Sequence, residues 1–115
     1  MKDAEKETKR LLRRLGADGT YLGFLFTAYG VAKVMEEPEL LTHISKGLYV
    51  DLAAHFHVST GSAERNIRTI RQLIWRRAEP ELLREVFPGS PEKEPANAEF
   101  IRAIVEYLRR EPERE

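Results

Sequence analysis

The sequence VSTGSAERNIRTIRQLIWRR, which runs from Val58 to Arg77, carries five arginines and one glutamate in a chain of zero formal net charge. At 100° per residue, apolar side chains at i, i+4, i+7 and i+11 fall on one narrow stripe, formed by Ala63, Ile67, Ile70 and Ile74. We therefore predict a helix over residues 61–77 that docks on the rest of the protein by this stripe. The opposite face has no hydrophobic side chain and consists of Gly61, Ser62, Arg65, Arg68, Thr69, Gln72 and Arg76.

Local signals support the start of this helix. Ser59 or Thr60 can accept a hydrogen bond from a free backbone N–H of the first turn, and Glu64 lies one turn before Arg68, where it can orient the guanidinium group. The preceding residues 49–57, YVDLAAHFH, have the apolar spacing of a short helix, and residues 58–60 have room only for a turn. Two helices joined by a tight turn, over about residues 49–77, outline a helix-turn-helix.

An arginine-rich helix face has two interpretations. In a helix-turn-helix the second helix reaches base edges in the major groove, and arginine bound to guanine is the commonest such contact. Many other arginine-rich faces are only solvated. The summed charge is about +3 over residues 1–15, about −3 over 16–60, about +4 over 61–77 and about −4 over 78–115. Such a local positive stripe can contact phosphates while the neutral body limits promiscuous binding.

Length and composition limit the class of protein. A chain of 115 residues is long enough for one domain and too short for two ordinary ones. It has no cysteine, which excludes disulfides and thiolate zinc sites and fits a reducing cytoplasm. No apolar run approaches the length of a membrane span, and the first residues, MKDAEKETKR, are polar rather than signal-like. We expect a cytoplasmic protein that works at the nucleoid and does not enter a membrane.

The rest of the chain has a helical pattern throughout. We predict a charged helix over residues 4–15 that ends at Gly16, and a strongly apolar core helix over 21–35 whose Gly23 and Gly30 indicate close packing. Shorter helices are expected over 38–45, 80–86 and 99–110, with a loop, PGSPEKEPAN, before the last one and a polar tail over 111–115. No alternating stretch favours a strand. The sequence predicts an all-α bundle of about six helices with a central helix-turn-helix.

Enzyme and metal functions have little support in the sequence. His43, His55 and His57 are the only histidines, and the i, i+2 pair points to different sides of a helix. The chain has no glycine-rich phosphate loop, no nucleophile elbow and no cysteine nucleophile. We therefore expect neither catalysis nor a cofactor or metal ion, and interpret the aromatic side chains of residues 21–35 as core.

From Gly16 to Arg110 the chain resembles the C-terminal DNA-binding effector domain of stage 0 sporulation protein A, the response regulator that starts endospore formation. The resemblance is carried by GFLFTAYGVAKVMEEPELLTHISKGLYVDLAAHFHVST at 23–60, AERNIR at 63–68, Trp75, and PANAEFI at 95–101. It implies about six helices with the helix-turn-helix in the middle. It also implies dimeric, head-to-tail binding to short promoter boxes of double-stranded DNA, with transcription regulated through RNA polymerase. Glu64, Arg65 and Arg68 stand where the recognition helix of this family touches DNA.

Three features depart from the family pattern. Ser62 stands where the family has its first base-reading arginine, which predicts an altered or weakened sequence preference. The PGSPEKEPAN loop is shorter and more acidic than its family counterpart, a change that bears on the contacts with polymerase. These 115 residues do not include the phosphorylatable receiver domain, which restrains the effector domain in the family.

Two functional hypotheses follow. The first is a sequence-specific DNA-binding transcription regulator, with residues 16–110 as the binding domain after an N-terminal helix over 1–15. Its recognition helix, about residues 61–77, would enter the major groove and use Ser62, Glu64, Arg65, Arg68, Thr69, Gln72 and Arg76. The alternative is an interaction module that keeps the fold, has impaired DNA binding and pairs with a full-length regulator. Arg65 and Arg68 favour the first, whereas Ser62 and the neutral net charge favour the second.

Overall fold

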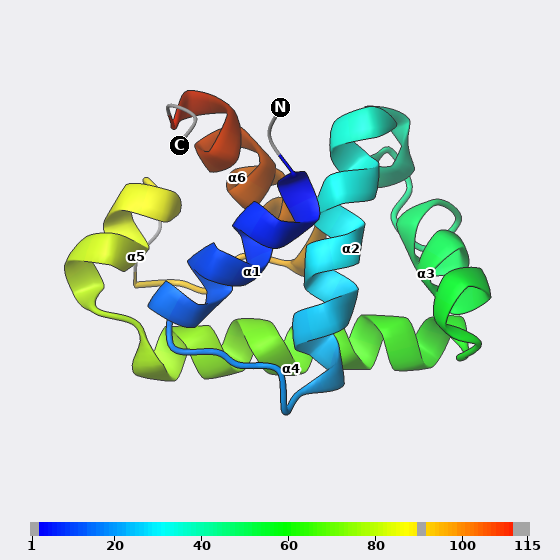
Figure 1. The fold of residues 1–115 in the computed structure, drawn as a ribbon, viewed down its shortest axis with the longest axis horizontal. Helices are drawn as coiled ribbons and strands as arrows, with labels where there is room; N and C mark the ends of the chain where they lie inside the picture. The colour runs from blue at the N-terminus through cyan, green and yellow to red at the C-terminus, as the bar shows by residue number, and fades with distance from the viewer. Residues whose placement is uncertain (1–2, 90–91, 112–115) are drawn as a thin grey trace.

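Every regular element in the described part of the chain is helical, which confirms the predicted fold class. The computed structural model describes residues 3–89 and 92–111, and Figure 1 shows how the elements are arranged. They are α1 (Ala4–Arg14), α2 (Leu22–Glu36), the 3₁₀ helix η1 (Pro38–Leu41), α3 (Leu48–Phe56), α4 (Thr60–Arg77), α5 (Pro80–Val86) and α6 (Asn97–Arg110). Residues 112–115 of the predicted tail lie outside the described residues, and Glu111 follows the end of α6.

Helix α2 is the central element of the core, as its apolar sequence predicts. Its buried side chains point in most directions around the axis, because α1, α3, α4 and α6 all pack on it. Gly23 lies directly against the backbone of Asn66 in α4, and Gly30 lies against Leu48 at the start of α3. Both predicted close contacts are therefore present, and the first brings the axes of α2 and α4 close together.

Helix α4 runs along one edge of the molecule, with α3 near its N-terminal end and α5 beyond its C-terminal end (Figure 1). The predicted apolar stripe of Ala63, Ile67, Ile70 and Ile74 is completely inaccessible to solvent. Trp75, on the border of this stripe, is half-buried and packs on Phe87 with 4.7 Å between the ring centroids. The helix thus docks by the stripe, and its opposite side faces outward.

Helix α1 contributes to the same core. Asp3 caps it by accepting a hydrogen bond from the backbone N–H of Lys6 at 3.1 Å, and Thr8, Leu11 and Leu12 are buried against α2 and α6. The helix ends where predicted, because Gly16 adopts a left-handed φ of 98° that residues with a Cβ rarely take. From there the chain turns onto the end of α4.

Two predicted helices differ from the structure by more than one residue at one end. The helix expected over residues 38–45 is only the single 3₁₀ turn η1, followed by turns up to Gly47, because a short segment with few buried side chains gains too little from packing to extend a helix. Helix α6 begins at Asn97 rather than Glu99, so the predicted loop over 88–97 is shorter by its last residue. Asn97 is the first residue of the helix, and its side chain makes hydrogen bonds to α3 and α4.

Candidate nucleic-acid interface

The outward side of α4 is a continuous polar face. Arg65, Thr69, Gln72 and Arg76 are all exposed and lie opposite the buried stripe, in the order that the helical repeat requires. The guanidinium groups of Arg65 and Arg76 make no hydrogen bond or ion pair with any residue in the described part of the chain. Their donors are therefore available to a ligand with acceptor groups or negative charge.

The remaining predicted residues lie on the flanks of this face and are half-buried. Arg68 donates to Glu64 at 2.9 Å between Nη1 and Oε2, which confirms the predicted pairing within the helix. The Ser62 hydroxyl accepts a hydrogen bond from Asn66 Nδ2 at 3.1 Å, and Asn66 also donates to the Ser62 carbonyl at 2.8 Å. Arg68 is thus held in one orientation, while the Ser62 side chain is engaged within its own helix.

The connection before α4 comprises three residues. His57 takes a left-handed φ of 57° at the end of α3, and Val58 donates its N–H to the carbonyl of Ala53 at 3.1 Å. Ser59 is the N-cap, because its hydroxyl accepts the backbone N–H of Ser62 at 3.0 Å. Of the two caps that the sequence allows, the structure uses Ser59. The tight turn orients the first turn of α4 relative to α3.

The five arginines of the quoted stretch have different environments. Arg71 is almost buried, with 12% of its side chain exposed, and donates to Asn97 Oδ1 at 3.0 Å and to Glu94 Oε1 at 2.6 Å. Arg77 donates to the carbonyl of Gly16 at 3.3 Å. These two arginines hold the loop before α6 and the loop after α1 against α4. Arg65 and Arg76 remain available, and Arg68 is held by Glu64.

The contacts of Asn97 were missed by the sequence analysis. Its Nδ2 donates to the Tyr49 hydroxyl of α3 at 2.9 Å and to the Glu64 carbonyl of α4 at 3.1 Å. Burial raises the pKa of the Tyr49 hydroxyl above its ordinary value. The only sign of these hydrogen bonds in the sequence is an amide side chain at the start of an apolar helix. Helical periodicity does not show which distant residues such a side chain contacts.

The three histidines have different environments. The His55 ring stacks on Tyr29 with 4.0 Å between centroids, His57 ends α3, and His43 is exposed on the turn after η1. Within residues 3–89 and 92–111 no three or more His, Cys, Asp and Glu side chains gather in a way that would hold a metal ion. No helix in the same residues is both long and apolar enough to cross a bilayer.

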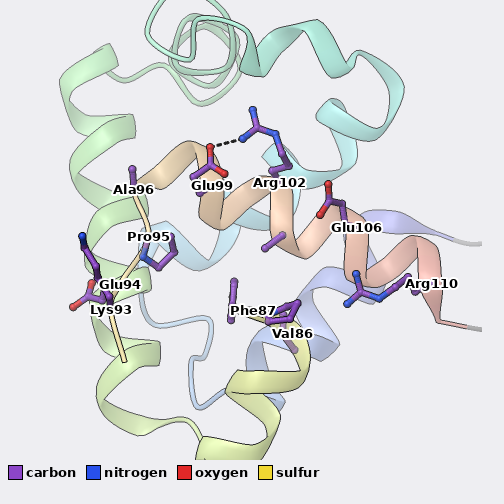
Figure 2. A pocket seen from close by; sticks show the side chains of 12 residues that line it. Val86, Phe87, Lys93, Glu94, Pro95, Ala96, Glu99, Arg102, Glu106 and Arg110 are labelled. Atoms are coloured by element: carbon purple, nitrogen blue, oxygen red, sulfur yellow. Dashed lines mark hydrogen bonds and ion pairs between the residues drawn. The ribbon is translucent and has the colours of Figure 1, made fainter. Parts of the chain in front are cut away.

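An open cavity of about 450 Å³ lies away from the polar face of α4. Figure 2 shows its lining: the end of α5 with Val86 and Phe87, the loop from Lys93 to Ala96, and charged side chains of α6. Glu99 and Arg102 form an ion pair across its wall. None of the exposed residues of the polar face, Arg65, Thr69, Gln72 and Arg76, lines this cavity.

The comparison with known proteins gives a match over most of the chain. The family model for the C-terminal region of sporulation initiation factor Spo0A matches residues 8–108. The matched region begins inside α1, includes α2 to α5 completely and ends near the C-terminus of α6. It therefore takes in the polar face of α4 and every element that packs behind it.

Proposed function

Because this chain belongs to the family of sporulation initiation factor Spo0A C-terminal domains, a family of DNA-binding transcription regulator domains, we propose that it is a sequence-specific regulator that reads promoter boxes with α4. In this proposal α3 and α4 form a helix-turn-helix, and the polar face of α4 enters the major groove. The observation that carries the proposal is the row of exposed side chains at Arg65, Thr69, Gln72 and Arg76, in which two guanidinium groups are unpaired among residues 3–89 and 92–111.

The environment of each side chain supports a different role. Arg65 lies near the N-terminal end of α4, the part of a recognition helix that reaches base edges, and its free guanidinium can bind guanine O6 and N7 together. Arg68 is oriented by Glu64 at 2.9 Å, so its remaining donors can meet either a base or a phosphate. Arg76 lies about three turns after Arg65 and is better placed for a phosphate.

The proposal includes the partners that the family implies. Two copies would bind neighbouring promoter boxes of double-stranded DNA, and contact with RNA polymerase would turn binding into regulation. The protein would then work in the cytoplasm at the nucleoid. Ser62 and Glu64, on the flanks of the face, would adjust sequence preference rather than provide the main contact.

One observation favours a second candidate function. The Ser62 hydroxyl is engaged by Asn66 at 3.1 Å, and the family resemblance implies a base-reading arginine at this position. A domain without that arginine loses one strong contact, and the zero net charge adds little non-specific attraction to compensate. The alternative is therefore an interaction module with impaired DNA binding that pairs with a full-length regulator.

The test begins with a duplex selected from a random DNA pool by the wild-type protein. The affinities for this selected duplex and for a scrambled duplex are then measured at two salt concentrations. A DNA reader prefers the selected duplex and loses affinity steeply as salt rises, because each neutralised phosphate releases a counterion. Failure to select any sequence, with weak binding that is insensitive to salt, would favour the interaction module.

Substitution of Arg65 identifies the reading residue. Arg65→Ala should reduce the preference for the selected duplex by about 1–3 kcal/mol, the value of one bidentate arginine contact, and relax selection at one base pair. Arg102→Ala is the matched control, because it removes the same charge from α6, where Arg102 pairs with Glu99. If both variants lose the same affinity for all duplexes, Arg65 does not read a base.

A further inference from the structure

Three elements of the protein meet at one buried amide, the side chain of Asn97. Only 8% of this residue is exposed. Its Nδ2 donates to the Tyr49 hydroxyl of α3 at 2.9 Å and to the Glu64 carbonyl of α4 at 3.1 Å, and its Oδ1 accepts from Arg71 Nε of α4 at 3.0 Å. A residue of α6 therefore holds α3 and α4 together at the helix pair on which DNA reading depends.

The two contacts on α4 lie on one flank of that helix. Glu64 and Arg71 are seven residues apart, close to two turns, so they lie almost above one another along the axis. This flank separates the buried stripe from the polar face. Arg71 is held from its other side by Glu94, at 2.6 Å in the loop before α6, and a charge-assisted bond of this kind is short and directional.

The apolar stripe of α4 fixes the rotation of the helix about its axis less sharply than hydrogen bonds do. Hydrophobic burial depends on the area removed from water and has no preferred direction. A hydrogen bond weakens steeply when its angle departs from linearity. Two hydrogen bonds from one amide to positions two turns apart oppose a rotation of α4 about its axis, and such a rotation would swing Arg65 sideways.

We propose that Asn97 is a positioning residue for DNA recognition: it sets the rotation of α4, and with it the direction of Arg65, through its bonds to Glu64, Arg71 and Tyr49. The inference rests on the proposed function and goes beyond it, because Asn97 itself touches no DNA. Arg71 belongs to the same device. It is a cation of the recognition helix that acts on the protein rather than on phosphates.

The quantity that tests this inference is the ratio of affinities for the selected and the scrambled duplex. A variant that is only less stable binds both duplexes more weakly by the same factor, since the folded fraction enters both affinities equally, and its ratio is unchanged. A rotated α4 loses base contacts but keeps most phosphate contacts, so the ratio falls while the salt dependence stays the same. Stability and positioning are thereby separated.

Asn97→Ala should lower this ratio about fivefold, the lower end of what one bidentate base contact supplies. Tyr49→Phe removes only the hydroxyl of α3 that accepts a hydrogen bond from Asn97. It should therefore lower the ratio less than Asn97→Ala does. Tyr107→Phe is the matched control: it also removes one hydroxyl from a buried tyrosine, but that hydroxyl donates to Glu85 at 3.0 Å, away from α4. Its ratio should equal that of the wild-type protein.

The outcomes separate the inference from the proposed function. Equal affinity of the wild-type protein for the two duplexes would overturn the proposed function and the inference with it. A clear wild-type preference that Asn97→Ala and Tyr49→Phe both retain would overturn the inference alone. If Asn97→Ala does not fold, Tyr49→Phe compared with Tyr107→Phe decides the question, because neither variant removes a core side chain.

Discussion

The two faces of α4 differ in what covers them. On the inner face, Ala63, Ile67, Ile70, Leu73 and Ile74 are closed over by the rest of the protein and are at most 2% exposed. On the outer face, Arg65, Thr69, Gln72 and Arg76 are exposed to solvent. The same helical repeat produces both. The inner face therefore carries stability and the outer face is available for recognition, and substitutions on the two faces should change different quantities.

The largest expected effect is the loss of stability caused by a substitution on the inner face. Ile67 is completely inaccessible to solvent, so Ile67→Ala leaves a cavity in the core and should lower the free energy of unfolding by about 2–5 kcal/mol. Gln72→Ala, on the outer face, should change it by less than about 0.5 kcal/mol. Urea denaturation followed by circular dichroism measures both. Similar losses for the two variants would mean that the faces are not divided as described.

A smaller loss of stability is expected from a substitution where α2 crosses α4. A Cβ at Gly23 would collide with the Asn66 carbonyl and lie 2.5 Å from Ile70 Cγ1, so Gly23→Ala must push two helix backbones apart. We expect a loss of about 1–3 kcal/mol in the free energy of unfolding, the usual cost of overpacking.

Gly30→Ala is the control for this crossing. The atoms nearest to a Cβ at Gly30 belong to the Leu48 side chain, at 3.5 Å, an ordinary van der Waals contact. Because alanine favours a helix by about 1 kcal/mol over glycine, this variant should be neutral or more stable than the wild-type protein. Thermal unfolding of the two alanine variants compares them directly. An equally destabilised Gly30→Ala would attribute the loss to α2 itself rather than to its crossing with α4.

Much of the division of α4 into a buried inner face and an exposed outer face could be predicted from the sequence, because it follows from local rules. The spacing of Ala63, Ile67, Ile70 and Ile74 specifies the buried stripe without any knowledge of the partner helices. Ser59 and the pair of Glu64 and Arg68 are also local, since capping and i, i+4 contacts involve residues within one turn. The family resemblance rests on residues spread over most of the chain, and the match over 8–108 confirms it.

The flanks of α4 could not be predicted, because their partners are distant in sequence. Arg71 and Asn97 are 26 residues apart and Arg77 and Gly16 are 61 apart. Periodicity assigns all five arginines of the stretch to a helix, but only tertiary packing shows that two of them bind the protein itself. The DNA contacts of the outer face stay predictions.

A gain of function is expected at Ser62, on the half-buried flank of the outer face. An arginine there could reach guanine O6 and N7, whereas the serine offers one hydroxyl that Asn66 already engages at 3.1 Å. Ser62→Arg should tighten binding to a family-type box by about 1–3 kcal/mol, and this gain should survive moderate salt. Ser62→Ala, which removes the hydroxyl alone, controls for the lost bond to Asn66. Equal tightening on scrambled DNA would instead support the interaction module.

The smallest effect is expected for Arg76, at the end of the outer face. Its guanidinium is unpaired among the described residues, and its distance of about three turns from Arg65 carries it along the groove toward a phosphate rather than a base. Arg76→Ala should weaken binding to all duplexes by a similar factor and lower the slope of log affinity against log salt by about one. Arg65→Ala should change sequence preference as well, so the two variants divide the outer face into a part that reads bases and a part that binds phosphates.

Salt titrations on selected and scrambled duplexes measure the sequence preference and the salt slope together. If Arg76→Ala also changes the preferred sequence, the whole length of α4 reads bases, whereas an unchanged salt slope would mean that α4 leaves the DNA before its last turn.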